Sequence, residues 1–244
     1  RWKVELEVGE AAQFDSLVVA TGHLSVPMHV PMFRDDFTGE YVHGHDYKDP
    51  VPFVGKRICI VGVGNSACDI AGDVCVTSPK CVLVARSGVL ILPKLFCGIP
   101  FTDITRQIQR RWIPTWFRRK LTAWLTFLVH GSMTKLGFKP LDKRAHVTSN
   151  GTIVNDIAYN RVTVKQGIER INGRAIHFDD GTAENFDTLI AATGYLVDLP
   201  FLSPEIVPLK GNRLDLYKRM VQPGWPGLYL MGFFNTDTSL NMVY

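Results

Sequence analysis

The sequence predicts an α/β protein built from paired Rossmann-like dinucleotide-binding units, each a three-layer arrangement of a mostly parallel sheet with a β-meander. Two observations predict this fold. One strand motif occurs twice, and a strand, a glycine-rich turn and a helix lie between its two copies. The chain has 244 residues, of which 46% are hydrophobic and 20% are charged. That composition is typical of globular proteins and suits one large domain or two small ones.

The repeated motif is a buried strand that ends in Ala-Thr-Gly. Residues 14–23 read FDSLVVATGH, and residues 186–195 read FDTLIAATGY, 172 residues later. An apolar run without alternation is typical of a strand covered on both faces of a parallel sheet. The glycine lets the backbone turn sharply and come close to a ligand. The candidate cofactor-binding residues at the two strand ends are Thr21, Gly22, Thr193 and Gly194.

A strand–turn–strand pattern precedes the second copy. Residues 162–171 predict a strand, Asn172-Gly173 a hairpin turn, and residues 174–178 a second strand. Before the first copy, residues 1–12 show only the last part of this pattern. A single copy would fit the strand end of any α/β protein, but the shared flanking pattern favours two related units. We therefore expect the chain to be a piece of a longer protein whose outer unit is incomplete here.

The segment between the copies predicts a dinucleotide-binding loop rather than an ordinary turn. Residues 56–61 form a buried strand, residues 62–67 read GVGNSA, a helix follows, and residues 80–85 form the next strand. In this context, G-x-G-x-x-A allows a tight turn, close approach of a pyrophosphate, and close helix–strand contact. The helix N-terminus adds amide donors and partial positive charge. The candidate binding residues in this loop are Gly62, Gly64, Asn65, Ser66 and Ala67.

The end of the next strand favours NADPH over NADH. An NAD site places an acidic residue about 20 residues after the loop to accept the ribose hydroxyls. Here Arg86 and Ser87 follow the strand instead. A guanidinium can pair with the 2′-phosphate of NADPH. The alternative is a surface arginine at a strand end. For the outer unit of the whole protein we expect a second nucleotide, most simply FAD.

A further motif lies between the first copy and the glycine loop. Residues 37–48 read FTGEYVHGHDYK, which matches F-x-G-x-x-x-H-x-x-x-[YF] followed by Lys. The chain holds four features in this order: this motif, the glycine loop, Arg86 and the second Ala-Thr-Gly strand. In these features it resembles the flavin-containing monooxygenases, which are the N- and S-oxidising branch of the class B flavin-dependent monooxygenases. The resemblance covers nearly the entire chain. The Baeyer–Villiger branch has Trp where this chain has Tyr47.

This resemblance implies an FAD- and NADPH-dependent oxidoreductase. It implies that NADPH reduces FAD, that oxygen forms a flavin C4a-hydroperoxide, and that an amine nitrogen or a sulfide is oxygenated. No residue of the chain is assigned to the chemistry itself. His43 and Tyr47 would couple NADP binding and domain movement to oxygenation, although we favour a structural role for His43. The family's FAD-binding loop would precede Arg1, so we expect the chain alone to be inactive. The alternatives are a non-catalytic NADPH-binding fragment and an enzyme resembling the flavin disulfide reductases.

The predicted organisation has four parts. A remnant of the FAD-binding domain covers residues 1–36, and a linker with the monooxygenase motif covers residues 37–54. An NADPH-binding domain covers residues 55–195 and carries a helical insertion at about residues 100–145. Residues 196–244 return to the FAD-binding domain.

The predicted insertion is rich in basic and aromatic residues. Residues 104–141 contain no Asp or Glu, and the pattern predicts two amphipathic helices separated by Pro114. One interpretation is contact of residues 104–130 with an anionic membrane surface. We favour the alternative, in which the insertion packs on the NADPH-binding domain and covers a substrate channel. A net charge of +4 without a recognisable binding fold does not indicate nucleic acid.

The remaining composition predicts a cytoplasmic protein, membrane-associated only if the insertion binds lipid. The five cysteines include no CxxC pair, which favours buried thiols in a reducing compartment. We expect neither a membrane span nor a signal peptide. We also expect a small-molecule substrate and no metal site. The oligomeric state cannot be derived from these patterns.

Overall fold

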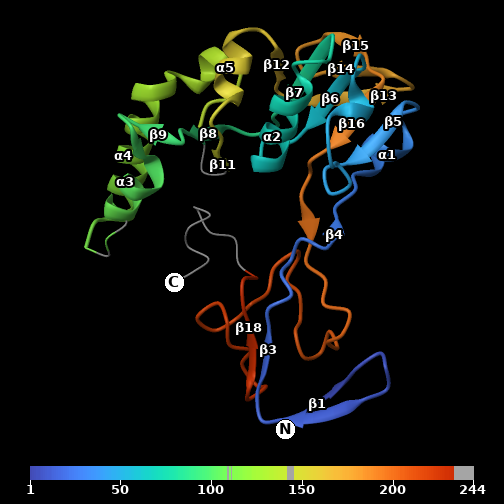
Figure 1. Ribbon diagram of the computed structural model, residues 1–244, viewed down its shortest axis with the longest axis vertical. Helices are drawn as coiled ribbons and strands as arrows, with labels where there is room; N and C mark the ends of the chain where they lie inside the picture. Colours follow the sequence, from blue (N-terminus) through green and yellow to red (C-terminus); the bar gives the residue numbers. More distant parts are fainter. Residues whose placement is uncertain (109, 111, 142–145, 234–244) are drawn as a thin grey trace. The chain divides into compact units, whose positions relative to one another are not determined.

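The computed structural model describes residues 1–108, 110, 112–141 and 146–233 (Figure 1). It divides into two compact units. Unit 1 comprises Arg1–Met28 and Gly194–Tyr244, and unit 2 comprises His29–Thr193. Parts of two predicted segments lie outside the described residues. They are Gln109, Arg111 and residues 142–145 of the insertion, and residues 234–244 of the last segment.

Unit 2 is built on a five-stranded, fully parallel sheet with the order β12-β7-β6-β16-β5. Its strands are β5 (Glu40–His43), β6 (Arg57–Val61), β7 (Lys80–Val84), β12 (Val162–Lys165) and β16 (Thr188–Ala191). The first βαβ strand, β6, lies in the middle, with β7 and β12 on one side and β16 on the other. This is the strand order of a dinucleotide-binding unit, so the predicted α/β fold is confirmed.

The sheet is covered on both faces because its central strands are apolar on both faces. Ile58 and Ile60 of β6 pack with α2 (Asn65–Val74) and α5 (Ile153–Ala158). Cys59 points to the opposite face and packs with a three-stranded meander. The meander consists of β13 (Ile168–Asn172), β14 (Ala175–Phe178) and β15 (Ala183–Asn185), and α1 (Pro31–Asp35) adds Phe33 to the same cluster. The result is the predicted three-layer arrangement.

One predicted strand is two strands in two different sheets. The prediction of a single strand over residues 162–171 is wrong, because β12 ends at Lys165 in the parallel sheet and β13 begins at Ile168 in the meander. Gly167 lies between them, where a Cβ atom would overlap the carboxylate of Asp179. The apolar pattern continues across this turn and therefore does not reveal it.

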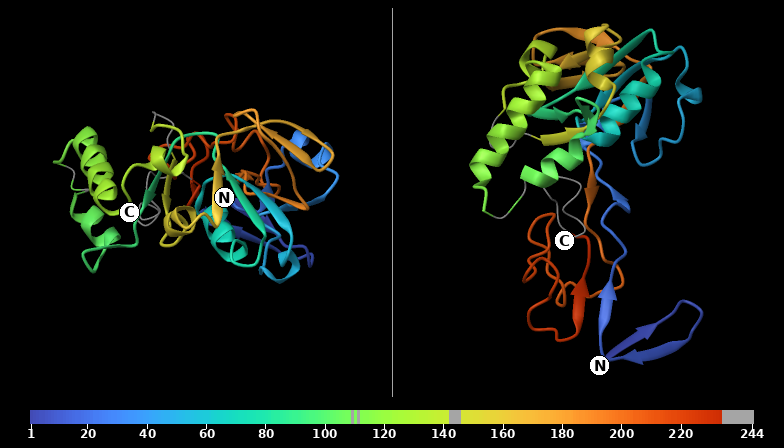
Figure 2. Two further views of the ribbon diagram at one scale, coloured as in Figure 1. Left: turned by 90° about the horizontal axis from the view of Figure 1, so that it is seen from above. Right: turned by 60° about the vertical axis from the view of Figure 1, so that its left-hand side comes forward.

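The insertion contains two helices on either side of Pro114, as predicted. It begins after β8 (Val89–Leu92), which pairs in parallel with β11 (His146–Ser149). Between them lie β9 (Leu95–Phe96), β10 (Ile99–Pro100), α3 (Phe101–Ile108), α4 (Thr115–His130) and the 3-10 helix η2 (Met133–Leu136). The helices α3 and α4 lie together beside the sheet in both views of Figure 2.

The predicted apolar face of the second helix is not covered by the described residues. Phe117, Trp124 and Leu128 of α4 are 44%, 56% and 53% exposed. Only Thr126 of this helix is buried. Among the described residues, none of the helices combines the length and the apolar character that crossing a bilayer requires.

Unit 1 has a small core of its own. The hairpin of β1 (Trp2–Glu5) and β2 (Ala11–Phe14) precedes β3 (Leu17–Val19), which pairs in parallel with β18 (Leu228–Leu230). β4 (Val26–Pro27) pairs with β17 (Tyr195–Leu196). Both copies of the repeat are thus parallel strands. Both are followed by a glycine with positive φ, +78° at Gly22 and +91° at Gly194.

The two units and the predicted four-part organisation have different boundaries, and that organisation stays a prediction. The divisions fall after Met28 and after Thr193, compared with predicted boundaries after residues 36 and 195. The predicted linker, residues 37–54, packs within unit 2, where it provides the edge strand β5 and the 3-10 helix η1 (Val51–Phe53). The assignment of the units to FAD and NADPH stays a prediction.

Candidate functional site

The carboxyl ends of β6 and β16 lie side by side where the chain changes from one face of the sheet to the other. From β6 the chain continues into α2, which covers the face of Ile58 and Ile60. It enters β16 from the meander, which covers the opposite face. Ligands of open α/β sheets bind in the crevice at such a switch point. The loops after β6, β16 and β5 therefore form the candidate site.

The glycine loop begins with a turn that only glycine can occupy. Gly62 has a φ of +130°, and its N–H donates to the carbonyl oxygen of Val84 at 3.0 Å. A Cβ atom on Gly62 would overlap the carbonyl oxygen of Ala192 in the loop after β16. Both the backbone conformation and this contact exclude a side chain here.

The N-terminus of α2 is open. Its N-cap is Gly64, which makes no side-chain capping bond, and the first turn holds no acidic residue. The first-turn amides, those of Asn65, Ser66 and Ala67, have no carbonyl partner within the helix. Asn65 and Ser66 are exposed. These amides and the partial positive charge of the helix end are suited to a pyrophosphate.

Two side chains of the loop are engaged within the protein. The Oδ1 atom of Asn65 accepts a hydrogen bond from the backbone N–H of Ser149 at 3.0 Å. Ala67 is fully buried and packs between α2 and the sheet. Ala67 can therefore offer a ligand only its backbone amide.

Arg86 lies at the same edge of the sheet with its charge free. The bond from Gly62 to Val84 places the ends of β6 and β7 next to each other, and Arg86 follows Val84 by two residues. It is exposed, and among the described residues it has no ion-pair or hydrogen-bond partner. Ser87 beside it is half-buried. A free guanidinium at this position can pair with an anionic group of a ligand.

His43 ends β5 at the same carboxyl edge. It lies opposite Ala191 of β16 and is 2% exposed. Its Nδ1 atom accepts a hydrogen bond from the backbone N–H of His45 at 3.1 Å. This bond lies within the turn after β5. The structural role that we favoured for His43 and the coupling role both stay predictions.

Tyr47 holds the same segment against α2. Its ring stacks on Phe53 with 5.5 Å between centroids, and its hydroxyl donates to Oδ2 of Asp73 at 3.4 Å. Burial, with Asp73 nearby, raises the pKa of Tyr47 well above its usual range. The hydroxyl therefore stays protonated and remains a hydrogen-bond donor at neutral pH.

The two Ala-Thr-Gly turns belong partly to different units. Thr21 and Gly22 follow β3 in unit 1. Thr193 is the last residue of unit 2 and lies half-buried after β16, while Gly194 is counted with unit 1. Only Thr193 is thus placed at the carboxyl edge of the five-stranded sheet. Cofactor contacts at all four residues stay predictions.

The loop after β11 contacts the glycine loop, which sequence reasoning did not predict. The Thr148 hydroxyl donates to the carbonyl oxygen of Val63 at 2.6 Å, and Asn150 Nδ2 donates to Asp69 Oδ1 of α2 at 2.8 Å. Asn150 also caps α5 through its Oδ1 atom. Residues 148–151 read TSNG, which by itself indicates only a helix start.

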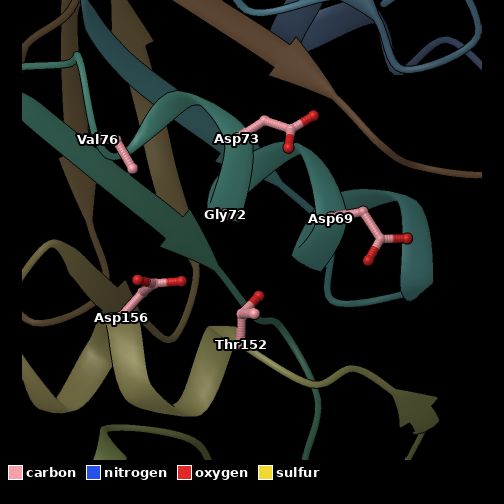
Figure 3. Close-up of a pocket in the computed structure, with 6 residues that line it drawn as sticks. All are labelled: Asp69, Gly72, Asp73, Val76, Thr152 and Asp156. Carbon is pink, nitrogen blue, oxygen red and sulfur yellow. The ribbon is translucent and has the colours of Figure 1, made fainter. Parts of the chain in front are cut away.

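A hollow on the side of α2 has the wrong charge for a nucleotide (Figure 3). It is lined by residues of α2, of α5 and of the segments next to them, namely Asp69, Gly72, Asp73, Val76, Thr152 and Asp156. Its carboxylates would repel phosphate groups. Within the described part of the chain, no group of three or more His, Cys, Asp or Glu residues is arranged to hold a metal ion.

The cysteines form no redox centre. Cys59, Cys68, Cys75 and Cys81 are buried and Cys97 is exposed, and all five are free thiols. Burial raises the pKa of Cys68 and of Cys81 to about 12, so both are protonated at neutral pH. Among the described residues, these thiols form no disulfide.

Comparison with known proteins places these features in one family. The model of the flavin-binding monooxygenase-like family matches residues 2–241. Dimethylaniline monooxygenase (N-oxide-forming) 2 of Rattus norvegicus is 31% identical over 229 residues, which cover 88% of this chain and 42% of the relative. The chain thus spans less than half the length of such relatives.

Two solved structures share the fold. The S-allyl-L-cysteine S-oxygenase of Allium sativum has a TM-score of 0.60 at 21% identity, covering 95% of this chain and 40% of that protein. An oxidised steroid monooxygenase bound to NADP has a TM-score of 0.59 at 17% identity, covering 95% of this chain and 58% of that protein.

Valine substitutions at the two glycines of the loop should have different effects. Gly64 has φ −70° and ψ 177°, extended backbone open to any residue, so Gly64→Val should keep the fold while its side chain blocks the pyrophosphate. Gly62→Val should destabilise the chain itself, because Gly62 has positive φ and contacts Ala192. Thermal unfolding and NADPH titration of both variants measure this difference. NADPH binding that survives Gly64→Val would place the pyrophosphate elsewhere.

Replacing Arg86 should weaken NADPH selectively. We expect Arg86→Ala to cost about 1–3 kcal/mol of NADPH binding, as for a charged hydrogen bond, with NADH unchanged. The matched control is Arg34→Ala, which removes an exposed arginine of α1. Isothermal titration with both nucleotides provides the comparison. Equal losses for NADPH and NADH would contradict pairing with the 2′-phosphate.

Proposed function

The chain belongs to the flavin-binding monooxygenase-like family, and we propose that it is the NADPH-binding part of a monooxygenase that oxygenates a soft nucleophile, an amine nitrogen or a sulfide. One observation carries the proposal. The open N-terminus of α2 follows the glycine loop at the same sheet edge as the free guanidinium of Arg86. This combination of donors and charge suits a dinucleotide with an additional phosphate.

The residues present fit NADPH. The amides at the start of α2 would bind the pyrophosphate, Arg86 would pair with the 2′-phosphate, and Ser87 would add a hydroxyl beside it. The fixed turn at Gly62 keeps these groups in place before a ligand arrives. When bound, NADPH supplies hydride to a flavin, and the oxygenation chemistry belongs to that flavin. The protein's own part is then binding, orientation and exclusion of water.

The substrate class follows from the names of similar proteins. One relative is an N-oxide-forming monooxygenase, and one structural neighbour is an S-oxygenase. Amine nitrogens and sulfides are both soft nucleophiles, so the proposal names this class and no single compound. FAD would be held by the longer protein, for which unit 1 supplies β3 and the Thr21–Gly22 turn.

Oxygen consumption distinguishes the proposed function from its alternatives. In the longer protein that contains this chain, NADPH oxidation should consume oxygen in proportion to an added amine or sulfide. Disulfide-dependent NADPH oxidation without oxygen uptake would instead identify a reductase. Tight NADPH binding with no oxidation of NADPH, even with FAD added, would indicate a protein that binds NADPH without catalysing a reaction.

Contact of residues 104–130 with an anionic lipid surface is a separate part of the proposal. Its support is the surface of α4, where Trp116 is 63% and Trp124 is 56% exposed. The Lys120 ammonium lies 5.7 Å from the centre of the Trp116 ring, so cations and exposed aromatic rings share this surface.

Vesicle sedimentation tests this contact. The chain should sediment with vesicles that contain phosphatidylserine and less with pure phosphatidylcholine, since the attraction is electrostatic. Trp124→Ala should reduce the bound fraction several-fold, whereas Trp225→Ala in unit 1 should not. Equal sedimentation of wild type and Trp124→Ala would contradict a role for α4.

A further inference from the structure

A buried threonine outside the sequence motifs holds the centre of the glycine loop. Thr148 is completely buried, and its hydroxyl donates to the carbonyl oxygen of Val63 at 2.6 Å. The Sγ atom of Cys68 lies 3.8 Å from the same oxygen, but a thiol is a weak donor. The threonine hydroxyl is therefore the main group that fixes this carbonyl.

Fixing the Val63 carbonyl also fixes the Gly64 amide. The peptide bond between the two residues is planar and trans, so its C=O and N–H groups point in opposite directions. With the carbonyl directed toward Thr148, the Gly64 N–H is directed away from it. Among the described residues, this N–H has no protein acceptor. It is thus left available for a ligand of the loop.

Thr148 is held in place by its neighbours on both sides. It lies opposite Ile91 in the parallel pair of β8 and β11. The next residue, Ser149, donates its backbone N–H to the Asn65 side chain, and Asn150 donates to Asp69 one turn further along α2. Three consecutive residues therefore contact this region. Thr148 contacts the glycine loop, Ser149 the first residue of α2, and Asn150 the second turn of α2. A hydroxyl fixed in this way can impose an orientation on the loop.

We propose that Thr148 is a positioning residue for the nucleotide: its hydroxyl orients the Val63–Gly64 peptide so that the Gly64 N–H is directed at the pyrophosphate. This inference rests on the proposed NADPH site. It also gives the end of the insertion a role, because β11 closes the insertion and contacts the cofactor loop directly.

Three variants of the 244-residue chain test the proposal. Thr148→Val keeps the shape and removes the hydroxyl, and we expect it to weaken NADPH binding about 10-fold, since a buried carbonyl loses its partner. Thr148→Ser keeps the hydroxyl and should bind within about twofold of wild type. The control is Thr126→Val, because the Thr126 hydroxyl is also buried and donates to a backbone carbonyl, that of Thr122, at 2.9 Å. It should leave the affinity for NADPH unchanged, because the described residues of α4 make no hydrogen bond with the glycine loop.

The outcomes separate this inference from the proposed function. If Thr148→Val binds NADPH as tightly as wild type, Thr148 is only structural and the inference is overturned, while the NADPH site stands. If wild type itself binds no NADPH, both fail. Should Thr148→Val not fold, Thr148→Ala and Thr126→Ala provide the same comparison.

Discussion

The close contact between Gly62 and the carbonyl oxygen of Ala192 determines the rest of the candidate site. It holds the loop after β6 against the loop after β16. Because β6 and β16 are neighbouring parallel strands, both loops lie at the carboxyl edge of the sheet. Three residues after Gly62, α2 begins at Asn65 with Gly64 as its N-cap, so its free first-turn amides lie at the carboxyl edge of the sheet. Any side chain at position 62 would separate the two loops and lose this arrangement.

Charge is distributed unequally around α2. Its N-terminus has no acidic residue, and Arg86 lies free at the neighbouring strand end. The side of the helix beyond its first turn carries Asp69 and Asp73, which line an acidic hollow. This charge distribution would attract an anionic nucleotide to one end of the helix and repel it from the flank. The proposed binding at the loop thus rests on the placement of a few charges as well as on the shape of the turn.

The sequence predicted those features that depend on local chemistry. The turn at Gly62, the helix after Gly64 and the Ala-Thr-Gly strand each carry their signal within about ten residues. The division of residues 162–171 between two sheets could not be predicted, because the apolar pattern continues across the turn and only the pairing of β12 with β7 and of β13 with β14 separates the two strands. Nor could the role of Thr148, whose partner Val63 is 85 residues away in the chain. Exposure of the apolar face of α4 was missed for a similar reason, since amphipathicity does not identify what covers a helix.

Amide chemical-shift mapping of the chain with NADPH tests the central claim most directly. The account predicts the largest shifts at the amides of Gly64, Asn65 and Ser66 and at the side chain of Arg86, with the Arg86 shift absent when NADH replaces NADPH. Shifts centred on the acidic hollow of Asp69, Asp73 and Asp156, or none at the loop, would contradict it.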